Sequence, residues 1–200
     1  MEKKYKLTEE TINVFNKTLY RIEALKDFSD VKKGDKGGYV EDEENLSQRC
    51  NCWVYGNAMV YDDARVYGDV VVRDKAKVYD NVVVSDKATI SGDAEIFDSA
   101  EVYGNAKICG DAMVYGNAEV YDKAIVCGDA MVYDYAEVYG SAEVFSKAKV
   151  FDNAKVYGNA EVYDDAKVFE DARIYGNAKV CGIAWVFDNA QVYGNTVVCG

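Results

Sequence analysis

One hydrophobic position recurs at every sixth residue through most of this chain. From Val54 to Val198 each of these positions holds valine or isoleucine, and the period never slips. From Ala58 to Ala190 the residue two places earlier is alanine, apart from two valines. Residues that lie two apart in a strand point to the same side of it. The pattern therefore predicts a series of short strands whose alanine and valine side chains form a shared core.

The remaining positions of each hexad complete a repeating unit of strand and corner. The residue between the two core positions is mostly charged, as at Arg65, Lys77 and Glu119, which suits an outward side chain in mid-strand. The other three residues are typically Tyr-Gly-Asn or Tyr-Asp-Asp. Glycine, asparagine and aspartate tolerate left-handed and turn backbone. A fixed short period of this kind is typical of a solenoid.

A longer period in the corner residues gives the number of hexads in one coil. Sorting the corners at 18 residues separates them into three classes, whereas sorting them at 12 mixes the classes. One class begins at Tyr61 and is aromatic at every step, a second is mostly tyrosine followed by glycine, and the third contains four of the six cysteines. The sequence predicts an all-β fold, a triangular parallel β-helix with 18 residues per coil and about eight coils.

Two resemblances support this interpretation. The motif Val-Tyr-Gly-Asn-Ala-Glu resembles the hexapeptide repeat of left-handed parallel β-helices, and the left-handed sense is implied by that resemblance alone. The N-terminal motifs Leu19-Tyr20-Arg21-Ile22, Gly37-Gly38-Tyr39-Val40 and Asn51-Cys52-Trp53-Val54 resemble the leader of YdcK-like β-solenoid repeat proteins of bacteria and tailed phages. Those proteins often carry a transferase label. The resemblance implies architecture and no particular chemistry.

The chain is expected to divide into a β-rich cap over residues 1–51 and the β-helix over residues 52–200. Residues 18–25 alternate well enough for a strand, although Ile12, Phe15, Leu19 and Ile22 also fit helical spacing. The open end of a solenoid exposes unpaired backbone, so the cap is expected to cover the first coil.

Composition narrows the cellular setting. The chain contains no histidine and no proline, and it has no apolar run long enough to cross a bilayer. Nothing near the N-terminus resembles a secretion signal, so we expect the cytoplasm of a bacterial host cell and no membrane partner. Cysteines in such a compartment are expected to be reduced. Cys50 and Cys52 lack the further ligands that a zinc site needs, and no metal is predicted.

The net charge of -12 lies almost entirely on the repeats. Residues 1–51 hold 10 basic and 11 acidic residues, whereas residues 52–200 hold 13 and 24. This excess of acid opposes direct contact with a nucleic-acid backbone, so direct nucleic-acid binding is not expected.

Catalysis is not expected either. Many left-handed β-helix proteins are acyltransferases that use a histidine as general base and an inserted loop to build the substrate site. This chain lacks histidine, and its hexad register continues without insertion. Cys109 and Cys127 have no neighbouring base, so we interpret them as small corner residues. No cofactor is predicted, and an acyltransferase-like protein remains an alternative function.

An acidic surface is the first candidate partner site. Its residues stack at the coil period on one face and along one edge: Glu101, Glu119, Glu137, Asp62, Asp80, Asp98, Asp134 and Asp152. Stacked like charges are destabilising and would favour a basic partner. The alternative function is therefore a nucleic-acid mimic that inhibits a basic host protein. The corner aspartates could also hold hard cations, but hydrogen bonding to their own backbone is the preferred interpretation.

The preferred function is a non-catalytic scaffold or protein-interaction module of bacterial or phage type that forms a homo-oligomer. Two surfaces are predicted to carry the self-association. The first is an apolar contact surface of mid-strand residues, namely Trp53, Val71, Ile125, Met113, Met131 and Trp185. The second is the final strand edge, which has no capping element: Val197, Val198 and Cys199.

Overall fold

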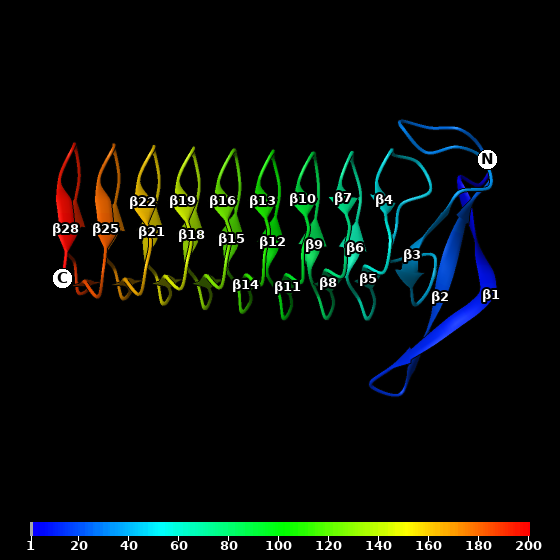
Figure 1. The fold of residues 1–200 in the computed structure, drawn as a ribbon, viewed down its shortest axis with the longest axis horizontal. Coiled ribbons are helices and arrows are strands. Elements are labelled where there is room, and N and C mark those ends of the chain that lie inside the picture. The colour runs from blue at the N-terminus through cyan, green and yellow to red at the C-terminus, as the bar shows by residue number, and fades with distance from the viewer. Residues whose placement is uncertain (1) are drawn as a thin grey trace.

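The structure, a computed structural model, describes residues 2–200. The chain winds into a straight rod of stacked coils, with strands β1 (Tyr5–Val14), β2 (Lys17–Ala24) and β3 (Lys36–Val40) at one end (Figure 1). Three sheets of parallel strands run along the rod and form its three sides. The expected β-solenoid of 18-residue coils is confirmed. The left-handed sense, implied by resemblance, stays a prediction.

Each side of the rod is built from every third strand, and we name the sides faces A, B and C. Face A consists of β5 (Met59–Val60), β8 (Lys77–Val78), β11 (Glu95–Ile96), β14 (Met113–Val114), β17 (Met131–Val132), β20 (Lys149–Val150), β23 (Lys167–Val168) and β26 (Trp185–Val186). Face B consists of β6 (Arg65–Val66), β9 (Val83–Val84), β12 (Glu101–Val102), β15 (Glu119–Val120), β18 (Glu137–Val138), β21 (Lys155–Val156), β24 (Arg173–Ile174) and β27 (Gln191–Val192). Face C consists of β4 (Trp53–Val54), β7 (Val71–Val72), β10 (Thr89–Ile90), β13 (Lys107–Ile108), β16 (Ile125–Val126), β19 (Glu143–Val144), β22 (Glu161–Val162), β25 (Lys179–Cys181) and β28 (Val197–Cys199).

None of the elements in residues 2–200 is a helix that could cross a bilayer.

Every coil is joined to the next by parallel backbone pairing at a separation of 18 residues. The N–H of Met113 donates to the carbonyl of Ala130 at 2.9 Å, and the N–H of Tyr115 donates to that of Val132 at 3.0 Å. The same step repeats on all three faces, so each strand finds its partners only in the neighbouring coils.

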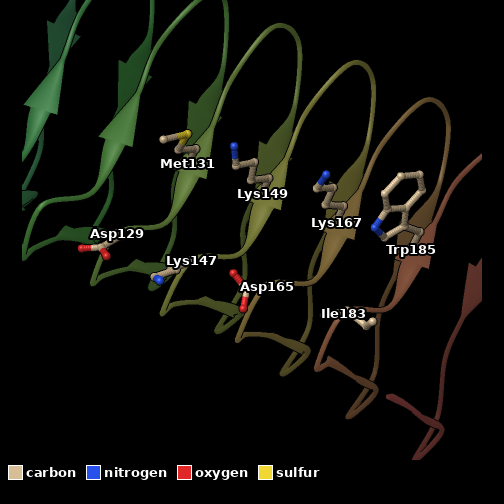
Figure 2. Close-up of a pocket in the computed structure, with 8 residues that line it drawn as sticks. All are labelled: Asp129, Met131, Lys147, Lys149, Asp165, Lys167, Ile183 and Trp185. Carbon is tan, nitrogen blue, oxygen red and sulfur yellow. The ribbon is translucent and has the colours of Figure 1, made fainter. Parts of the chain in front are cut away.

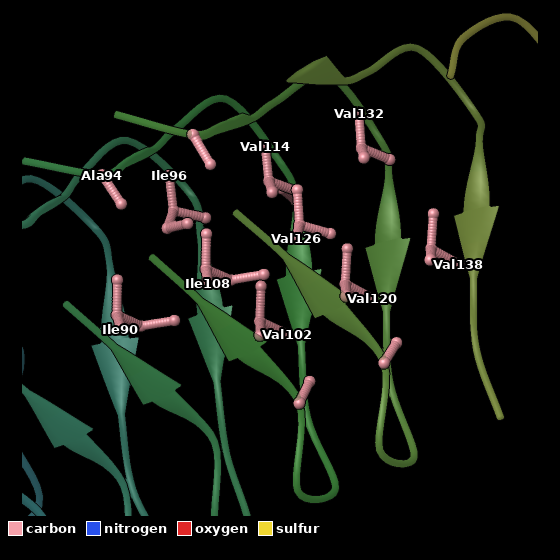
Figure 3. Packing of buried hydrophobic residues seen from close by; sticks show 14 of the residues in the cluster. Ile90, Ala94, Ile96, Val102, Ile108, Val114, Val120, Val126, Val132 and Val138 are labelled. Carbon is pink, nitrogen blue, oxygen red and sulfur yellow. The ribbon is translucent and has the colours of Figure 1, made fainter. Parts of the chain in front are cut away.

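The core is a column of valine, isoleucine and alanine inside the rod. Ile96, Val114 and Val132 on successive strands of face A are 0% exposed, and their side chains point inward from each coil (Figure 3). Alanine occupies the other inward position, because three short sides leave too little room for two large side chains per strand. The expected core positions are buried from Val54 to Val186, whereas Ala190 is exposed and Val198 is half-buried at the far end of the rod.

The second residue of each corner takes left-handed backbone. At these positions glycine alternates mainly with aspartate, and the φ angle of Asp98 is 61°. Aspartate is tolerated there because its carboxylate has a specific partner. Asp98 accepts a hydrogen bond at 3.1 Å from the N–H of Gly116, which lies in the following coil. The expectation that corner aspartates bond to their own backbone is wrong for Asp98, because its carboxylate accepts the N–H of the next coil instead.

Replacing Asp98 tests this inter-coil bond. Asp98→Ala removes the acceptor and places a residue with a low left-handed preference at φ 61°. We expect a loss of about 1–3 kcal/mol in the free energy of unfolding, from the unpaired amide and the backbone cost. Asp98→Asn keeps an acceptor and tolerates left-handed backbone, so it should lose less than about 1 kcal/mol. Urea unfolding measures both, and equal losses would contradict the assignment.

Aromatic side chains stack along the edges, as the corner classes predicted. Where faces A and B meet, Phe97 and Tyr115 stack with ring centroids 4.7 Å apart, and Tyr115 and Tyr133 follow at 4.8 Å. Where faces B and C meet, Tyr103 and Tyr121 stack at 4.8 Å. These ladders reinforce the spacing that the backbone pairing sets.

The N-terminal strands are continuous with face A. β1 and β2 form an antiparallel hairpin, β3 pairs with β2, and β3 also pairs in parallel with β5. This part of the chain is therefore a hairpin of strands, and the alternative helical spacing is not used. Gly38 packs against the carbonyl of Ala58 so closely that a Cβ atom could not be added without displacing backbone. The hairpin packs on the first coil, where Tyr5 and Ile22 share the core with Val54.

Candidate functional site

A shallow groove of about 910 Å³ runs along face A beside the edge that it shares with face C. Its floor is a row of outward side chains from four neighbouring strands, and its wall is formed by the preceding corners (Figure 2). The lining residues are Met131, Lys149, Lys167 and Trp185 in the row, and Asp129, Lys147, Asp165 and Ile183 in the corners. The groove is open along its length.

The two lysines of the row are stacked directly on each other. Lys149 and Lys167 are partners on adjacent parallel strands, about 4.8 Å apart at the backbone. Some other outward lysines are neutralised by a glutamate of an adjacent coil: Lys77 contacts Glu95 at 2.6 Å. By contrast, Lys147, Lys149 and Lys167 take part in none of the ion pairs found within residues 2–200. Three lysines and two aspartates therefore line the groove, which carries a small excess of positive charge on an acidic protein.

Exposed apolar side chains border these lysines. Trp185 is 59% exposed and Ile183 is 70% exposed. The ammonium of Lys167 lies 4.6 Å from the centroid of the Trp185 ring, a cation-π contact that fixes both groups at the end of the row. Met131 lies at the other end, next to its strand partner Met113. Cationic and apolar groups side by side suit a partner that supplies both carboxylates and apolar contacts.

The predicted apolar surface is thus only partly assembled. Met113, Met131 and Trp185 share face A, but Val71 and Ile125 lie on face C, where Lys107 separates them. Trp53 was expected to be exposed, and this was wrong: it is 1% exposed. The rings of Phe28 and Tyr5 pack against it edge-on at 5.3 and 6.1 Å. Trp53 therefore anchors the hairpin to the first coil.

The predicted acidic surface divides between a face and an edge. On face B, Glu101, Glu119 and Glu137 are successive strand partners. Their repulsion is reduced by neighbours: the Tyr103 hydroxyl donates to Glu119 at 2.9 Å, and Lys155 contacts Glu137 at 2.7 Å. Beyond Glu137 the row turns basic, with Lys155 followed by Arg173. Face B therefore carries three acidic coils rather than a uniformly negative surface.

The corner carboxylates lie where faces A and B meet, and we name this line the acidic edge. Its members are Asp62, Asp80, Asp98, Asp134, Asp152, Glu170 and Asp188. Asp62 is held by Lys17 of the hairpin. The carboxylate of Asp152 accepts the N–H of Glu170, and that of Glu170 accepts the N–H of Asp188. In five of the seven, namely Asp62, Asp80, Asp98, Asp152 and Glu170, a carboxylate oxygen accepts a backbone N–H of the next coil.

The cysteines fall into two groups. Cys109 is bonded to Cys127, and Cys181 to Cys199, each pair on neighbouring coils with Cα atoms 4.6 Å apart. The coil period brings each pair together on one edge, and the reduced state expected in a cytoplasmic protein stays a prediction. Val197 and Val198, beside Cys199, pair with β25 in the last strand, and Val197 is 62% exposed.

Cys50 and Cys52 lie against a buried lysine. Lys4 is 1% exposed, and its amine donates to the carbonyls of Cys50 and Cys52 at 2.9 and 2.7 Å. Burial lowers the pKa of Lys4 and raises the pKa of the Cys52 thiol, against the attraction between the two groups. Within residues 2–200 no three histidine, cysteine, aspartate or glutamate residues gather as a metal site.

Sequence reasoning missed the lysines of the groove and the exposed corner residue Ile183. A signal was available in the same 18-residue sorting. In the series that runs Met113, Met131, Lys149, Lys167 and Trp185, two lysines are consecutive and no acidic residue follows either of them. Elsewhere in the repeats, Lys77 is followed at this spacing by Glu95. An unbalanced pair of like charges in a ladder is the feature that marks this face.

The fold and the repeat define the class of protein: a β-solenoid repeat protein. The family model described as YdcK β-solenoid repeat matches residues 60–74 and 106–122. A stretch of 50 residues is 42% identical to a protein of Escherichia coli strain K12 whose name reads "uncharacterized acetyltransferase YdcK". The match covers 24% of this chain and 15% of that protein. The chain is YdcK-like in its repeats, as the resemblance implied.

Proposed function

We propose that the protein is a non-catalytic β-solenoid scaffold that works by binding protein surfaces and associates with copies of itself. The observation that carries this proposal is the open groove on face A, where Lys149 and Lys167 lie unneutralised between Met131 and the 59% exposed Trp185. Exposed apolar side chains gathered in this way mark contact surfaces between proteins, and tryptophan is common among the residues that carry binding energy. A groove on a flat sheet offers a long contact instead of an enclosed chamber.

An acyltransferase is the competing candidate. The observation that favours it is the printed name of the Escherichia coli relative, which this chain matches over 15% of that protein's length. An acetyl donor is an anion with a long apolar arm, and the lysines of the groove could attract it. The two candidates make opposite predictions about a small ligand.

The deciding experiment measures mass and ligand response on the same sample. Light scattering after size exclusion, over a hundredfold range of protein concentration, should show a defined oligomer that dissociates on dilution. Acetyl-coenzyme A should leave the melting temperature unchanged, because a ligand stabilises only a protein that binds it in the folded state. A melting temperature that rises with acetyl-coenzyme A, together with acetyl transfer to an amine acceptor, would show that the scaffold proposal is wrong.

A further inference from the structure

Two unneutralised ladders of opposite charge border the same face. Lys149 and Lys167 line the groove at one border of face A, and Asp152 and Glu170 lie on the acidic edge at its other border. Neither carboxylate is found among the ion pairs of residues 2–200. Within one molecule the breadth of the face separates the two ladders, so each charge is left for an external partner.

The two ladders also match in height along the rod. Asp152 follows Lys149 by three residues in one coil, and Glu170 follows Lys167 by three residues in the next. Because the same coil repeat sets both spacings, two parallel rods at equal height bring each lysine level with one carboxylate. The match extends to apolar groups: Tyr135, which is 63% exposed on the acidic edge, is level with Met131 in the groove.

We propose that the groove of one molecule binds the acidic edge of a second copy, with Lys149 level with Asp152 and Lys167 level with Glu170. This inference rests on the proposed scaffold function and names its partner surface. Contact at equal height is also the arrangement that uses the whole rod. The row of the groove spans four coils, which at about 4.8 Å per coil give a matched contact about 19 Å long.

The geometry also defines the symmetry of the assembly. The groove and the acidic edge are different surfaces, so the contact is head-to-tail and each molecule has one of each. Neighbours at equal height are related by a rotation about an axis parallel to the rods, with no shift along it. Such an arrangement does not grow into a helical fibre, and it closes into a ring where the rotation between neighbours divides a full turn.

The test uses two complementary variants of the full chain. The groove variant carries Lys149→Ala and Lys167→Ala, and keeps its acidic edge. The edge variant carries Asp152→Asn and Glu170→Asn, and keeps its groove. Asparagine preserves an acceptor for the inter-coil bonds and tolerates left-handed backbone, so the fold is retained. Circular dichroism verifies folding before the masses are compared.

Each variant alone should self-associate at least tenfold more weakly than the parent protein. Mixed in equal amounts, they should form a one-to-one complex, because one intact groove meets one intact edge and neither partner can extend the assembly. The matched control combines Lys107→Ala with Asp122→Asn, a face C lysine and a carboxylate of another edge, and should leave the oligomer unchanged.

The outcomes separate this inference from the proposed function. A parent protein that stays monomeric at every concentration contradicts both self-association and this interface. A parent oligomer that both variants form equally well overturns the groove-to-edge contact and leaves the scaffold function standing. Weakened variants whose mixture forms no one-to-one complex also overturn the head-to-tail contact.

Discussion

Deleting one whole coil, residues 81–98, should leave a folded protein with a shorter rod. The deletion joins Asp80 to Ser99, which restores the sequence of an ordinary corner and removes one strand from each face. The carboxylate of Asp80, which now accepts the N–H of Asp98, would meet the N–H of Gly116. Because each coil contacts only its neighbours, the free energy of unfolding should fall by the contribution of one coil and one interface between coils, about a few kcal/mol in total.

Deleting Asn81 alone should have a far larger effect. The corner between β8 and β9 has no spare residue. The deletion therefore shifts the sequence of every following strand by one residue, which exchanges its inward-facing and outward-facing positions. Valine and alanine side chains then point outward, and charged residues point into the core. We expect a loss above about 4 kcal/mol in the free energy of unfolding, or failure to fold. Circular dichroism and urea unfolding of both deletions decide the matter, and equal stabilities would contradict strict register.

Alkaline pH should unfold the rod through its stacked tyrosines. Burial, reinforced by the neighbouring carboxylates of Glu95 and Asp80, raises the pKa of Tyr79 to about 12. Burial with the adjacent Tyr115 and Asp134 raises the pKa of Tyr133 to about 12. Burial also raises the pKa of Tyr103 and Tyr121. Each of these groups loses a proton more readily in the unfolded chain, where its pKa is about 10.

The direction of the pH effect follows from these raised values. The stabilisation from the neutral phenols is fully present below pH 10 and is lost as the pH rises towards 12, because the unfolded chain then binds fewer protons than the folded one. Ellipticity and tyrosinate absorbance should therefore change together in this range. Tyrosines that ionise near pH 10 while the ellipticity stays constant would contradict the expectation.

A variant of the same ladder provides the control. Tyr79→Phe with Tyr133→Phe removes two ionising groups and keeps the stacked rings, as Phe97 and Phe151 already do in the native ladder. Its unfolding midpoint should move to higher pH. An unchanged midpoint would assign the alkaline transition to other groups.

Much of the fold could be read from local repetition. The core positions, the corners and the three-sided coil follow from periods of six and 18 residues, because each strand pairs with a neighbour at a fixed separation. The aromatic ladders and the cysteine edge follow from the same arithmetic. The candidate site was harder to predict from the sequence. Met131 and Trp185 were identified as part of a contact surface, but the lysines between them were not.

The sequence by itself determined the repeat, because any chain with valine and alanine at these positions gains a core only by coiling at this period. Only the tertiary structure decided which outward residues stay exposed. Trp53 has the same place in its hexad as Ile125, yet Phe28 and Tyr5 cover it, because the irregular N-terminal strands fold back over the first coil. Likewise, Lys149 and Lys167 stay outside any ion pair because their strand partners are Met131, Trp185 and each other, whereas Lys77 and Lys155 have glutamates as strand partners.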